Sequence, residues 1–136
     1  MLVSTKGRYA LRFLLDLAQH KDAGVISLQA VAERQNVSKK YLERIVSLLS
    51  PSGILKITRG YQGGYQLARD PELITVAEIL MLTEGGFSPV PIDEARECPA
   101  SAFAWESLEG AITRCLENIT LQDILDHSDP VIEYYI

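Results

Sequence analysis

The stretch Arg59-Gly60-Tyr61-Gln62-Gly63-Gly64-Tyr65 decides the fold. Its three glycines predict a tight turn, because glycine reaches backbone conformations that other residues avoid. The flanking segments, Ile54–Thr58 and Tyr65–Leu67, are rich in β-branched, aromatic and aliphatic residues, which favour strands. We therefore expect a short hairpin with Arg59 and Tyr61 near its tip.

Two short amphipathic helices are expected before this hairpin. Ser27 and Ser38 are suitable N-cap residues, residues 36–38 separate the helices, and residues 51–53 end the second one. Helix, tight turn, helix and hairpin is the order of a winged helix-turn-helix, which reads DNA. For the helices alone, a helical hairpin with a solvated charged face is the alternative. Together with the hairpin, the pattern favours a mainly α fold with a small β-wing.

The second helix has an apolar and a charged side. Leu42, Ile45 and Leu49 recur at helical spacing and can face a core. The charged residues fall mainly on the opposite side: Lys39, Lys40, Glu43 and Arg44.

A further helix is expected at the start of the chain, from Ser4 to about Gln19. Its apolar residues form one stripe that can pack beneath the helix-turn-helix. Lys6 and Arg8 lie at its start, where positive charge is unfavourable unless an anion is close. A DNA phosphate would supply that anion; complete solvation is the alternative.

Charge separates the two halves of the chain. The formal net charge of −5 argues, taken alone, against a nucleic-acid partner. Residues 1–70, however, hold eleven Lys or Arg against five acids, a net +6, whereas residues 71–136 hold two against thirteen, a net −11. This asymmetry indicates a nucleic-acid face next to a separate regulatory or oligomeric half.

The sequence of the second half predicts one helix before a loop and two helices after it. Thr75–Glu78 begins one helix that runs to about Leu82, Gly85–Pro99 is a loop, and Thr120–Asp123 begins a short final helix. Between them, an apolar stripe at steps of three and four predicts a long amphipathic helix: Trp105, Leu108, Ile112, Cys115, Leu116 and Ile119. This stripe can fold back on its own domain or pair with a second subunit; we expect a homodimer. The domains are then 1–84, the DNA-binding unit, and 85–136, the loop, dimerisation helix and tail.

Several functional classes are excluded or disfavoured. The apolar runs are too short to span a bilayer and no secretion signal stands out, so we expect a cytoplasmic protein without a membrane partner. His20 and His127 are far apart, and neither adjoins a nucleophile motif. The glycine-rich turn lacks the lysine and following helix of a phosphate loop. We therefore do not expect an enzyme.

The chain resembles the Rrf2 family of bacterial winged helix-turn-helix regulators over essentially its whole length. The matching segments are Ser4–Leu11, Val37-Ser38 with Tyr41–Glu43, the wing from Arg59 to Tyr65, and Glu84-Gly85. This resemblance implies a homodimer that binds an imperfect palindrome in double-stranded DNA, usually as a repressor.

The resemblance also implies which residues contact DNA. It places the recognition helix in the major groove, with Glu43 accepting hydrogen bonds from cytosine amino groups. It places Arg59 in the minor groove, where narrow A·T tracts favour arginine. The complete expected set is Lys6, Arg8, Tyr9, Ser38, Lys39, Lys40, Tyr41, Glu43, Arg44, Arg59 and Tyr61.

Many family members carry a [2Fe–2S] cluster on three cysteines in the loop before the long helix, with five residues between successive cysteines. Cys98 fits the first position, but the next two hold Ala104 and Gly110, which cannot bind iron. Cys115 lies on the apolar stripe, where we expect a small buried residue. We expect no cofactor and no metal ligands; the alternative is an iron–sulfur or redox-sensing regulator of the same family.

Finally, the sequence resembles the cluster-free cysteine-metabolism repressors of the family, which share an ending like Tyr134-Tyr135-Ile136. Cysteine synthase accepts a C-terminal isoleucine of partner proteins at its active site, where the terminal carboxylate imitates that of the substrate. The resemblance therefore implies cysteine synthase as a partner of these three residues. A tail that is disordered or docked on its own domain is the alternative.

Overall fold

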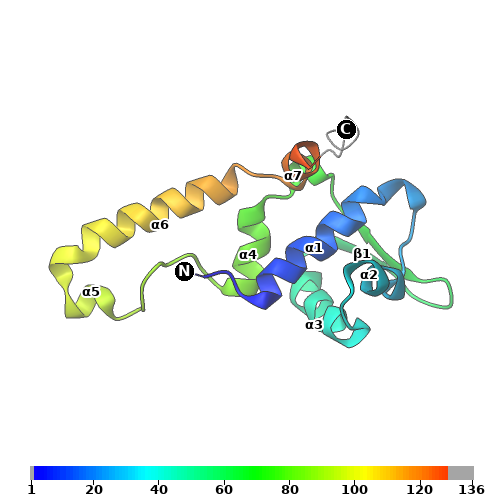
Figure 1. Cartoon of the computed structure of the whole chain (residues 1–136), viewed down its shortest axis with the longest axis horizontal. Coiled ribbons are helices and arrows are strands. Elements are labelled where there is room, and N and C mark those ends of the chain that lie inside the picture. Colours follow the sequence, from blue (N-terminus) through cyan, green and yellow to red (C-terminus); the bar gives the residue numbers. More distant parts are fainter. Residues whose placement is uncertain (1, 129–136) are drawn as a thin grey trace, which may run out of the picture.

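The structure is a computed structural model of the 136-residue chain and describes residues 2–128. It is mainly helical with one small antiparallel sheet, which confirms the expected fold class (Figure 1). The helices and strands are α1 (Thr5–Gln19), α2 (Leu28–Gln35), α3 (Lys39–Leu49), β1 (Leu55–Thr58), β2 (Gly64–Leu67), α4 (Val76–Glu84), α5 (Glu94–Glu97), α6 (Ala102–Glu117) and α7 (Leu121–His127). Short 3-10 turns cover Lys21–Ala23, Ser50–Ser52, Pro71–Leu73 and Pro99–Ser101.

Five of the helices have a serine or threonine at the N-cap. Its hydroxyl oxygen accepts a hydrogen bond from a backbone N–H of the first turn, which has no partner within the helix. The caps are Ser4 for α1, Ser27 for α2, Ser38 for α3, Thr75 for α4 and Thr120 for α7. The predicted helix starts at Ser27, Ser38, Thr75 and Thr120 are therefore confirmed.

The break between α2 and α3 lies where it was expected. Asn36 adopts a left-handed conformation, with φ of 53°, and ends α2. Asparagine tolerates this conformation better than most residues do. The chain can then turn into Ser38 and begin α3, which produces the tight helix-turn-helix.

The main core forms around α1. Phe13 and Leu14 are fully buried, and Leu42, Ile45 and Leu49 of α3 pack into the same cluster. The apolar side of the second predicted helix therefore faces the core, as expected. The core fixes α3 against α1 and leaves the opposite side of α3 in solvent.

The wing is a hairpin in which Leu55 pairs with Leu67 and Thr58 pairs with Gly64. Tyr65 also exchanges two backbone hydrogen bonds with Ile26, at 2.8 and 3.0 Å, which ties the wing to the segment before α2. A side chain at Gly64 would meet this segment, because its Cβ would lie 2.3 Å from the Ile26 carbonyl oxygen. Glycine is required at this close approach of two backbones.

The region predicted as a loop, residues 85–99, contains the one-turn helix α5. Four residues are too few to show a helical period, so sequence periodicity could not indicate it. The long helix α6 ends at Glu117, and Ile119 of the predicted stripe therefore lies beyond its end.

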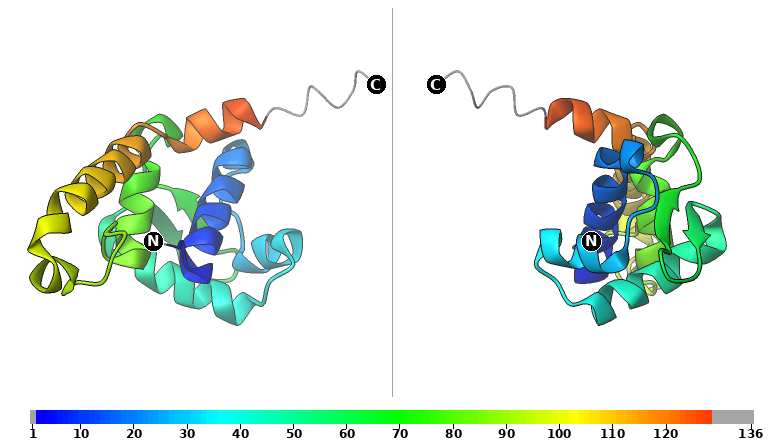
Figure 2. Two further views of the ribbon diagram at one scale, coloured as in Figure 1. Left: turned by 60° about the vertical axis from the view of Figure 1, so that its left-hand side comes forward. Right: turned by 90° about the vertical axis from the view of Figure 1, so that its right-hand side faces the viewer.

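After α6 the chain returns to the core. Leu121 of α7 is fully buried, and its N–H donates to the Ile74 carbonyl at 3.0 Å. The final helix therefore packs on the body formed by residues 2–84, although the sequence grouped it with the dimerisation segment. In Figures 1 and 2, α7 and α3 lie on opposite sides of α1, and α6 leads away from the body. Among residues 2–128, no helix combines the length and apolar character needed to cross a bilayer.

Candidate nucleic-acid interface

The outer face of α3 carries the predicted contact residues. Lys39, Lys40, Glu43 and Arg44 are exposed, while the intervening Leu42 is buried. Helical geometry imposes this separation, because residues three and four apart share a face. The expected charged surface is therefore present, on a helix that the core holds in place.

Ser38 and Tyr41 fix the beginning of this helix. The Tyr41 N–H donates to Ser38 Oγ at 3.0 Å, which leaves the Ser38 hydroxyl proton free for another acceptor. The Tyr41 ring meets Tyr9 edge-on, with centroids 5.7 Å apart, and the Arg12 guanidinium lies 4.5 Å from the Tyr9 ring centroid. These contacts couple the start of α3 to α1.

The start of α1 lies next to the same face. Lys6 and Arg8 are both exposed, and Arg8 donates to Thr5 Oγ1 at 3.2 Å. A pocket between α1 and α3 is lined by Lys6, Tyr41 and Arg44, among others. Residues distant in the sequence thus line one pocket, with the positive charge of Lys6 on one side and that of Arg44 on the other.

Glu84 holds the start of α1 from the end of α4. Its carboxylate accepts hydrogen bonds from the Ser4 N–H, at 2.9 Å, and from the Ser4 hydroxyl, at 2.7 Å. Burial raises the pKa of Glu84, but the two bonds from Ser4, helped by Thr83 and the charge of Lys6, outweigh burial and lower the pKa overall. The ionised carboxylate therefore stabilises the turn that carries Lys6 and Arg8.

The wing presents Arg59 and Tyr61 at its tip. Arg59 is exposed and Tyr61 is 99% exposed. Gly60 between them has φ of 105°, a conformation that favours glycine. A fully solvated tyrosine at the end of the hairpin does not contribute to the core, so both side chains are available for a ligand.

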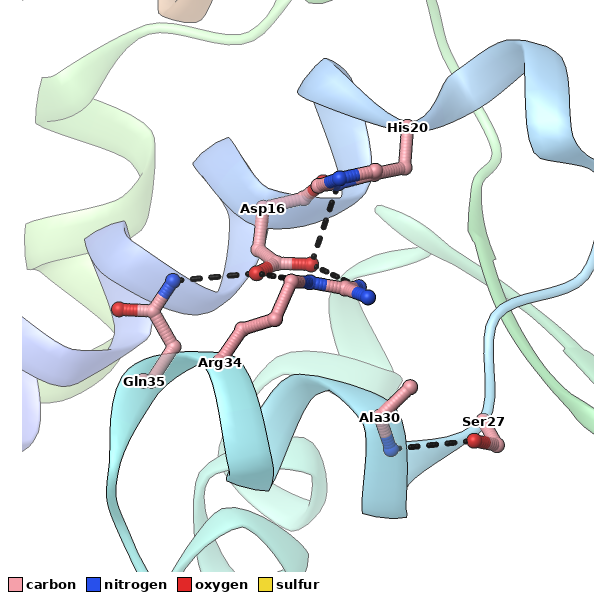
Figure 3. Close-up of polar contacts among 6 residues, drawn as sticks. All are labelled: Asp16, His20, Ser27, Ala30, Arg34 and Gln35. Carbon is pink, nitrogen blue, oxygen red and sulfur yellow. Dashed lines mark hydrogen bonds and ion pairs between the residues drawn. The ribbon is translucent and has the colours of Figure 1, made fainter.

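A buried acid anchors α2 beneath this surface, and sequence reasoning missed it (Figure 3). The Asp16 carboxylate accepts two hydrogen bonds from Arg34, at 2.6 and 3.0 Å, and one from Gln35 at 3.1 Å. Asp16 is only 1% exposed. The bonds bind α1 to α2 across the helix-turn-helix, and they satisfy a charge that would otherwise be costly to bury.

The electrostatic balance at Asp16 favours the ionised form. Burial raises the pKa of Asp16, but the hydrogen bonds from Arg34 and Gln35, with the charges of Arg34 and His20, lower it further than burial raises it. His20 ends α1, and its Nδ1 lies 2.8 Å from the Asp16 backbone oxygen. The sequence did contain a signal for this buried acid: Asp16 follows Phe13 by three residues and therefore lies within the apolar stripe of α1.

Most cations of the basic half keep their charge free for a ligand. Among residues 2–128, salt bridges of Lys or Arg involve only Arg34, with Asp16, and Arg69, with Glu78. The Glu78 carboxylate thus binds Arg69, while the Glu78 N–H donates to the Thr75 hydroxyl that begins α4. The six cations at the predicted DNA contacts have no such partner in the described part of the chain: Lys6, Arg8, Lys39, Lys40, Arg44 and Arg59.

The residues around Cys98 do not fit an iron–sulfur cluster. Cys98 is exposed, but the two following positions of the family spacing hold Ala104 and Gly110 on α6, and neither has a donor atom. Within residues 2–128, no three His, Cys, Asp or Glu side chains gather closely enough to hold a metal ion. Cys115 is exposed in the single chain, so the expectation of a buried thiol is wrong for one subunit.

The predicted dimerisation stripe is divided between two surroundings. Ile112, Leu116 and Ile119 are partly buried against the α4 cluster of their own chain, and Trp105 lines a pocket with the loop after α4. Leu108 is 43% exposed, and Cys115 is exposed as well. A single chain therefore covers part of the stripe and leaves the rest in solvent.

Comparison with known proteins agrees with this architecture. The family model Rrf2, described as an iron-dependent transcriptional regulator, matches residues 3–127. The HTH-type transcriptional regulator CymR of Bacillus subtilis (strain 168) is 38% identical over 136 residues, which cover 100% of this chain and 98% of CymR.

Solved structures give the same result. The structure of CymR, described as the global cysteine regulator of B. subtilis, matches with a TM-score of 0.84 and 38% identity, over 95% of this chain and 99% of that chain. IscR of T. potens matches with a TM-score of 0.79 and 38% identity, over 96% and 90%. The chain belongs to the Rrf2 family of transcriptional regulators, and it is a DNA-binding protein rather than an enzyme.

Proposed function

We propose that this protein is a homodimeric repressor of cysteine and sulfur metabolism genes that acts in the cytoplasm and is controlled by cysteine synthase. The observation that carries the DNA-reading part is the outer face of α3, where exposed cations surround Glu43 and form no salt bridge with any acid of residues 2–128. The start of α1 and the wing tip add exposed cations of the same kind, again judged within the described part of the chain.

In this proposal α3 enters the major groove. Glu43 accepts from a cytosine amino group, while lysine and arginine hold phosphates or guanine. Lys6, Arg8 and Tyr9 contact the phosphate backbone, and Arg59 and Tyr61 enter the minor groove. Along α3 the proposed contacts are Ser38, Lys39, Lys40, Tyr41, Glu43 and Arg44.

Two variants of the same helix test this reading. Lys40→Ala removes a phosphate contact, so it should weaken binding to all duplexes alike and reduce the slope of log affinity against log salt by about 1. Glu43→Ala should relax preference at one base position per half-site, by about 1–3 kcal/mol. Fluorescence anisotropy with single-base operator variants measures both effects. If Glu43→Ala left the base preference unchanged, the assigned register of α3 would be wrong.

Dimerisation through α6 follows from the surface that one chain leaves uncovered. Leu108 and Cys115 are exposed on a helix that leads away from the body. A twofold pair would present two copies of α3 to the two halves of an imperfect palindrome. Sedimentation at micromolar concentration distinguishes this dimer from a monomer.

The assignment to cysteine metabolism rests on similarity to CymR along the entire chain. CymR is described as a global cysteine regulator. Transcript profiling of a deletion strain tests this part: genes of cysteine uptake and synthesis should be derepressed. Unchanged transcript levels of these genes would contradict the assignment to cysteine metabolism. They would leave the proposal that the protein reads DNA intact.

Control by cysteine synthase would use Tyr134, Tyr135 and Ile136, which lie outside the described residues. A terminal carboxylate on an apolar side chain can occupy a site built for an amino-acid substrate. Helix α7, which precedes this segment, lies on the side of α1 away from α3 (Figure 2). A partner bound beyond α7 would therefore leave the face of α3 accessible to DNA.

Substrate competition would then set the signal. O-acetylserine is the substrate from which cysteine synthase makes cysteine. When it is abundant, it displaces the tail from the enzyme. When cysteine is sufficient, O-acetylserine is scarce, and the complex of regulator and enzyme persists. Repression increases only if the enzyme favours the DNA-competent state, because equal affinity for both states shifts nothing.

Peptides of the last ten residues provide the direct test. The native peptide should compete with O-acetylserine for cysteine synthase, and a matched peptide without Ile136 should not. In the full chain, deleting Ile136 should abolish the complex but preserve dimerisation and intrinsic DNA binding. Equal behaviour of both peptides at high micromolar concentration would remove cysteine synthase from the proposal.

An iron–sulfur or redox sensor is the second candidate, favoured by the family description and by the similarity to IscR. Ala104 and Gly110 argue against it, because they replace two thiolates. Protein purified without oxygen should carry little iron and no acid-labile sulfide. Near-stoichiometric iron and sulfide, lost in Cys98→Ala, would reverse the ranking of the two candidates.

A further inference from the structure

An apolar groove lies beside α7, the last helix that the structure describes (Figure 2). Ile119 and Ile124 supply its apolar lining, and both are also partly buried against the α4 cluster, which holds their side chains in place. The groove has a volume of about 510 Å³, more than one aliphatic side chain fills. Its lining residues are Asn118, Ile119, Asp123, Ile124, His127 and Ser128.

The last described residue, Ser128, is itself part of the groove wall. Its N–H donates to the Ile124 carbonyl at 3.0 Å, and its hydroxyl donates to the Leu125 carbonyl at 3.0 Å, which fixes the end of α7. The sequence then continues with Asp129-Pro130. Proline has no N–H and disfavours helical backbone at the residue before it, so the sequence does not favour a longer α7. The segment after Pro130 is therefore attached to the body at the groove.

The sequence of this segment is strongly apolar. Residues 131–136 are Val-Ile-Glu-Tyr-Tyr-Ile, so five of the six are aliphatic or aromatic. The proposed contact with cysteine synthase uses the last three and assigns no role to Val131 and Ile132. Both are β-branched, which favours extended backbone. Burial of an aliphatic side chain lowers the free energy, and the groove that adjoins Ser128 offers an apolar surface for it.

We propose that Ile132 folds back into the groove between Ile119 and Ile124 of its own chain. Four residues of extended chain reach up to about 13 Å beyond Ser128, whereas Ile124 lies one helical turn before Ser128, about 6 Å along the axis. A loop of this length loses little entropy on closure, and the tether keeps the side chain at an effective concentration in the millimolar range. A separate molecule in the same groove would lose translational and rotational freedom. The tail of the same chain is therefore the favoured occupant.

Alternation along an extended chain selects Ile132 rather than Val131. Successive side chains point to opposite sides, so Ile132 in the groove places Val131 and Glu133 on the outside. Glu133 then keeps its hydration. If Val131 entered instead, Glu133 would lie on the groove side, near Asp123, which lines the groove. Two carboxylates at an apolar surface repel each other and lose hydration, which disfavours this alternative.

An anchored tail also changes how cysteine synthase is met; this consequence, unlike the docking itself, rests on the proposed function. Beyond Ile132 only residues 133–136 are free, and four residues reach about 13 Å. The enzyme would therefore bind close to α7, and the anchor would direct the tail toward it. A segment ordered in advance loses less entropy on binding, so loss of the anchor should weaken the complex about 2- to 10-fold.

Methyl NMR of the full chain, labelled at isoleucine Cδ1, tests the docking without the enzyme. The wild type should show nuclear Overhauser contacts between Ile132 and Ile124. Ile132→Ser should remove them and shift the methyl resonances of Ile119 and Ile124, whereas the resonance of Ile45, in the core of the body, should not move. Glu133→Ser, at the neighbouring outward position, is the matched control and should leave all three resonances unchanged.

Three results would overturn the anchor. Unchanged Ile119 and Ile124 resonances in Ile132→Ser, without contacts to Ile132 in the wild type, would mean that the tail does not occupy the groove. The same shifts caused by Ile136→Ser instead would make the terminal residue the occupant. Contacts found only between differently labelled copies would assign the groove to a second chain.

Affinity for cysteine synthase separates the anchor from the proposed partner. In the full chain Ile132→Ser should weaken binding, but in the isolated peptide of the last ten residues, which has no groove, the same change should have no effect. Equal losses in chain and peptide would contradict the anchor's role, because the enzyme itself would then hold Ile132. If the native chain and the native peptide both failed to bind, cysteine synthase would be removed from the proposed function, whereas contacts between Ile132 and Ile124 would still support the anchor.

Discussion

The body of the protein and the α6 arm differ in how much of their structure one chain can complete. The body surrounds fully buried side chains such as Phe13, Leu14 and Ile45. Within α6, by contrast, every residue of the described helix is at least partly exposed. An apolar surface left in water costs free energy, so it indicates a missing partner. The DNA-reading unit can therefore be specified within one chain, whereas the arm calls for a second copy.

Matched truncations in the two regions should give the largest contrast. Leu14→Ala opens a cavity in a completely buried site and should lower the free energy of unfolding by about 3–5 kcal/mol. Leu108→Ala at nanomolar concentration should cost less than about 0.5 kcal/mol, because its side chain is 43% exposed. Urea unfolding at both low and high protein concentration measures the pair. Equal costs at low concentration would remove the distinction between body and arm.

Leu108→Glu should separate association from folding. A charge buried in an apolar interface between two subunits costs several kcal/mol of association free energy. In the monomer the same glutamate lies in solvent, so the free energy of unfolding changes little. Sedimentation should show monomers with native helix content by circular dichroism. Leu108→Gln is the matched uncharged control and should weaken the dimer less. A variant that remains dimeric at low micromolar concentration would place Leu108 outside the interface.

Breaking the Asp16–Arg34 pair should destabilise the body by about 2–3 kcal/mol. Arg34→Met leaves a buried carboxylate without its main donor; we reduce the usual cost of such a change because the Arg34 side chain is 37% exposed. The pKa of Asp16 should rise, because burial is then opposed only by Gln35 and His20. Urea unfolding and carboxyl titration by NMR measure the two effects. Lys56→Met, which removes an exposed cation on β1, is the control.

The ionised Asp16, which pairs with Arg34, and the ionised Glu84 should make the free energy of unfolding depend on pH in the acid range. Asp16 and Glu84 both have lowered pKa values in the folded state. Their contribution is therefore complete above the unfolded-state pKa of a carboxyl group, about 4, and is lost as the pH falls through the lower folded-state pKa. Asp16→Asn should show a smaller decrease in stability between pH 5 and pH 2 (values from about one unit above to two below the unfolded pKa). An unchanged pH profile would mean that the pair is not formed in solution.

Glu84→Gln should have the smallest effect, about 1 kcal/mol in stability. Glutamine can still accept from Ser4, but it lacks the charge that strengthens both hydrogen bonds. Because these bonds hold the turn with Lys6 and Arg8, amide exchange near Ser4 should accelerate. Glu72→Gln, at an exposed site, is the control. Equal exchange rates in the two variants would assign Glu84 no role in holding α1.

Features encoded by neighbouring residues could be predicted from the sequence, and features that join distant segments could not. The Ser27 and Ser38 caps and the glycine-rich wing are local, so short patterns indicated them. The bond between Asp16 and Arg34 crosses eighteen positions, and no local period reports such a pair. Composition shows the charge of Asp16 and of Arg34, but it does not show which acid and which cation become neighbours in the fold.

The α6 stripe shows a second reason for incomplete prediction. Periodicity identifies an apolar face but not what covers it. Ile112 and Leu116 pack within the chain, while Leu108, one turn away at the edge of the same stripe, remains exposed. The apolar stripe of α6 is wide enough to contact its own chain on one side and leave the other side exposed. The sequence pattern alone predicted a single interface. The short helix α5 escaped prediction because one turn has no period.

The central claim is that two bodies read DNA because two arms hold them together. Duplexes selected from a random pool should be titrated by fluorescence anisotropy, using the complete palindrome, one isolated half-site, and wild-type or Leu108→Glu protein. We predict that the wild type binds the palindrome with two protomers per duplex and at least about 100-fold more tightly than the half-site, a gain of effective concentration. Leu108→Glu should lose this advantage but bind the half-site equally well. One wild-type protomer per duplex, with equal affinity for palindrome and half-site, would contradict the account.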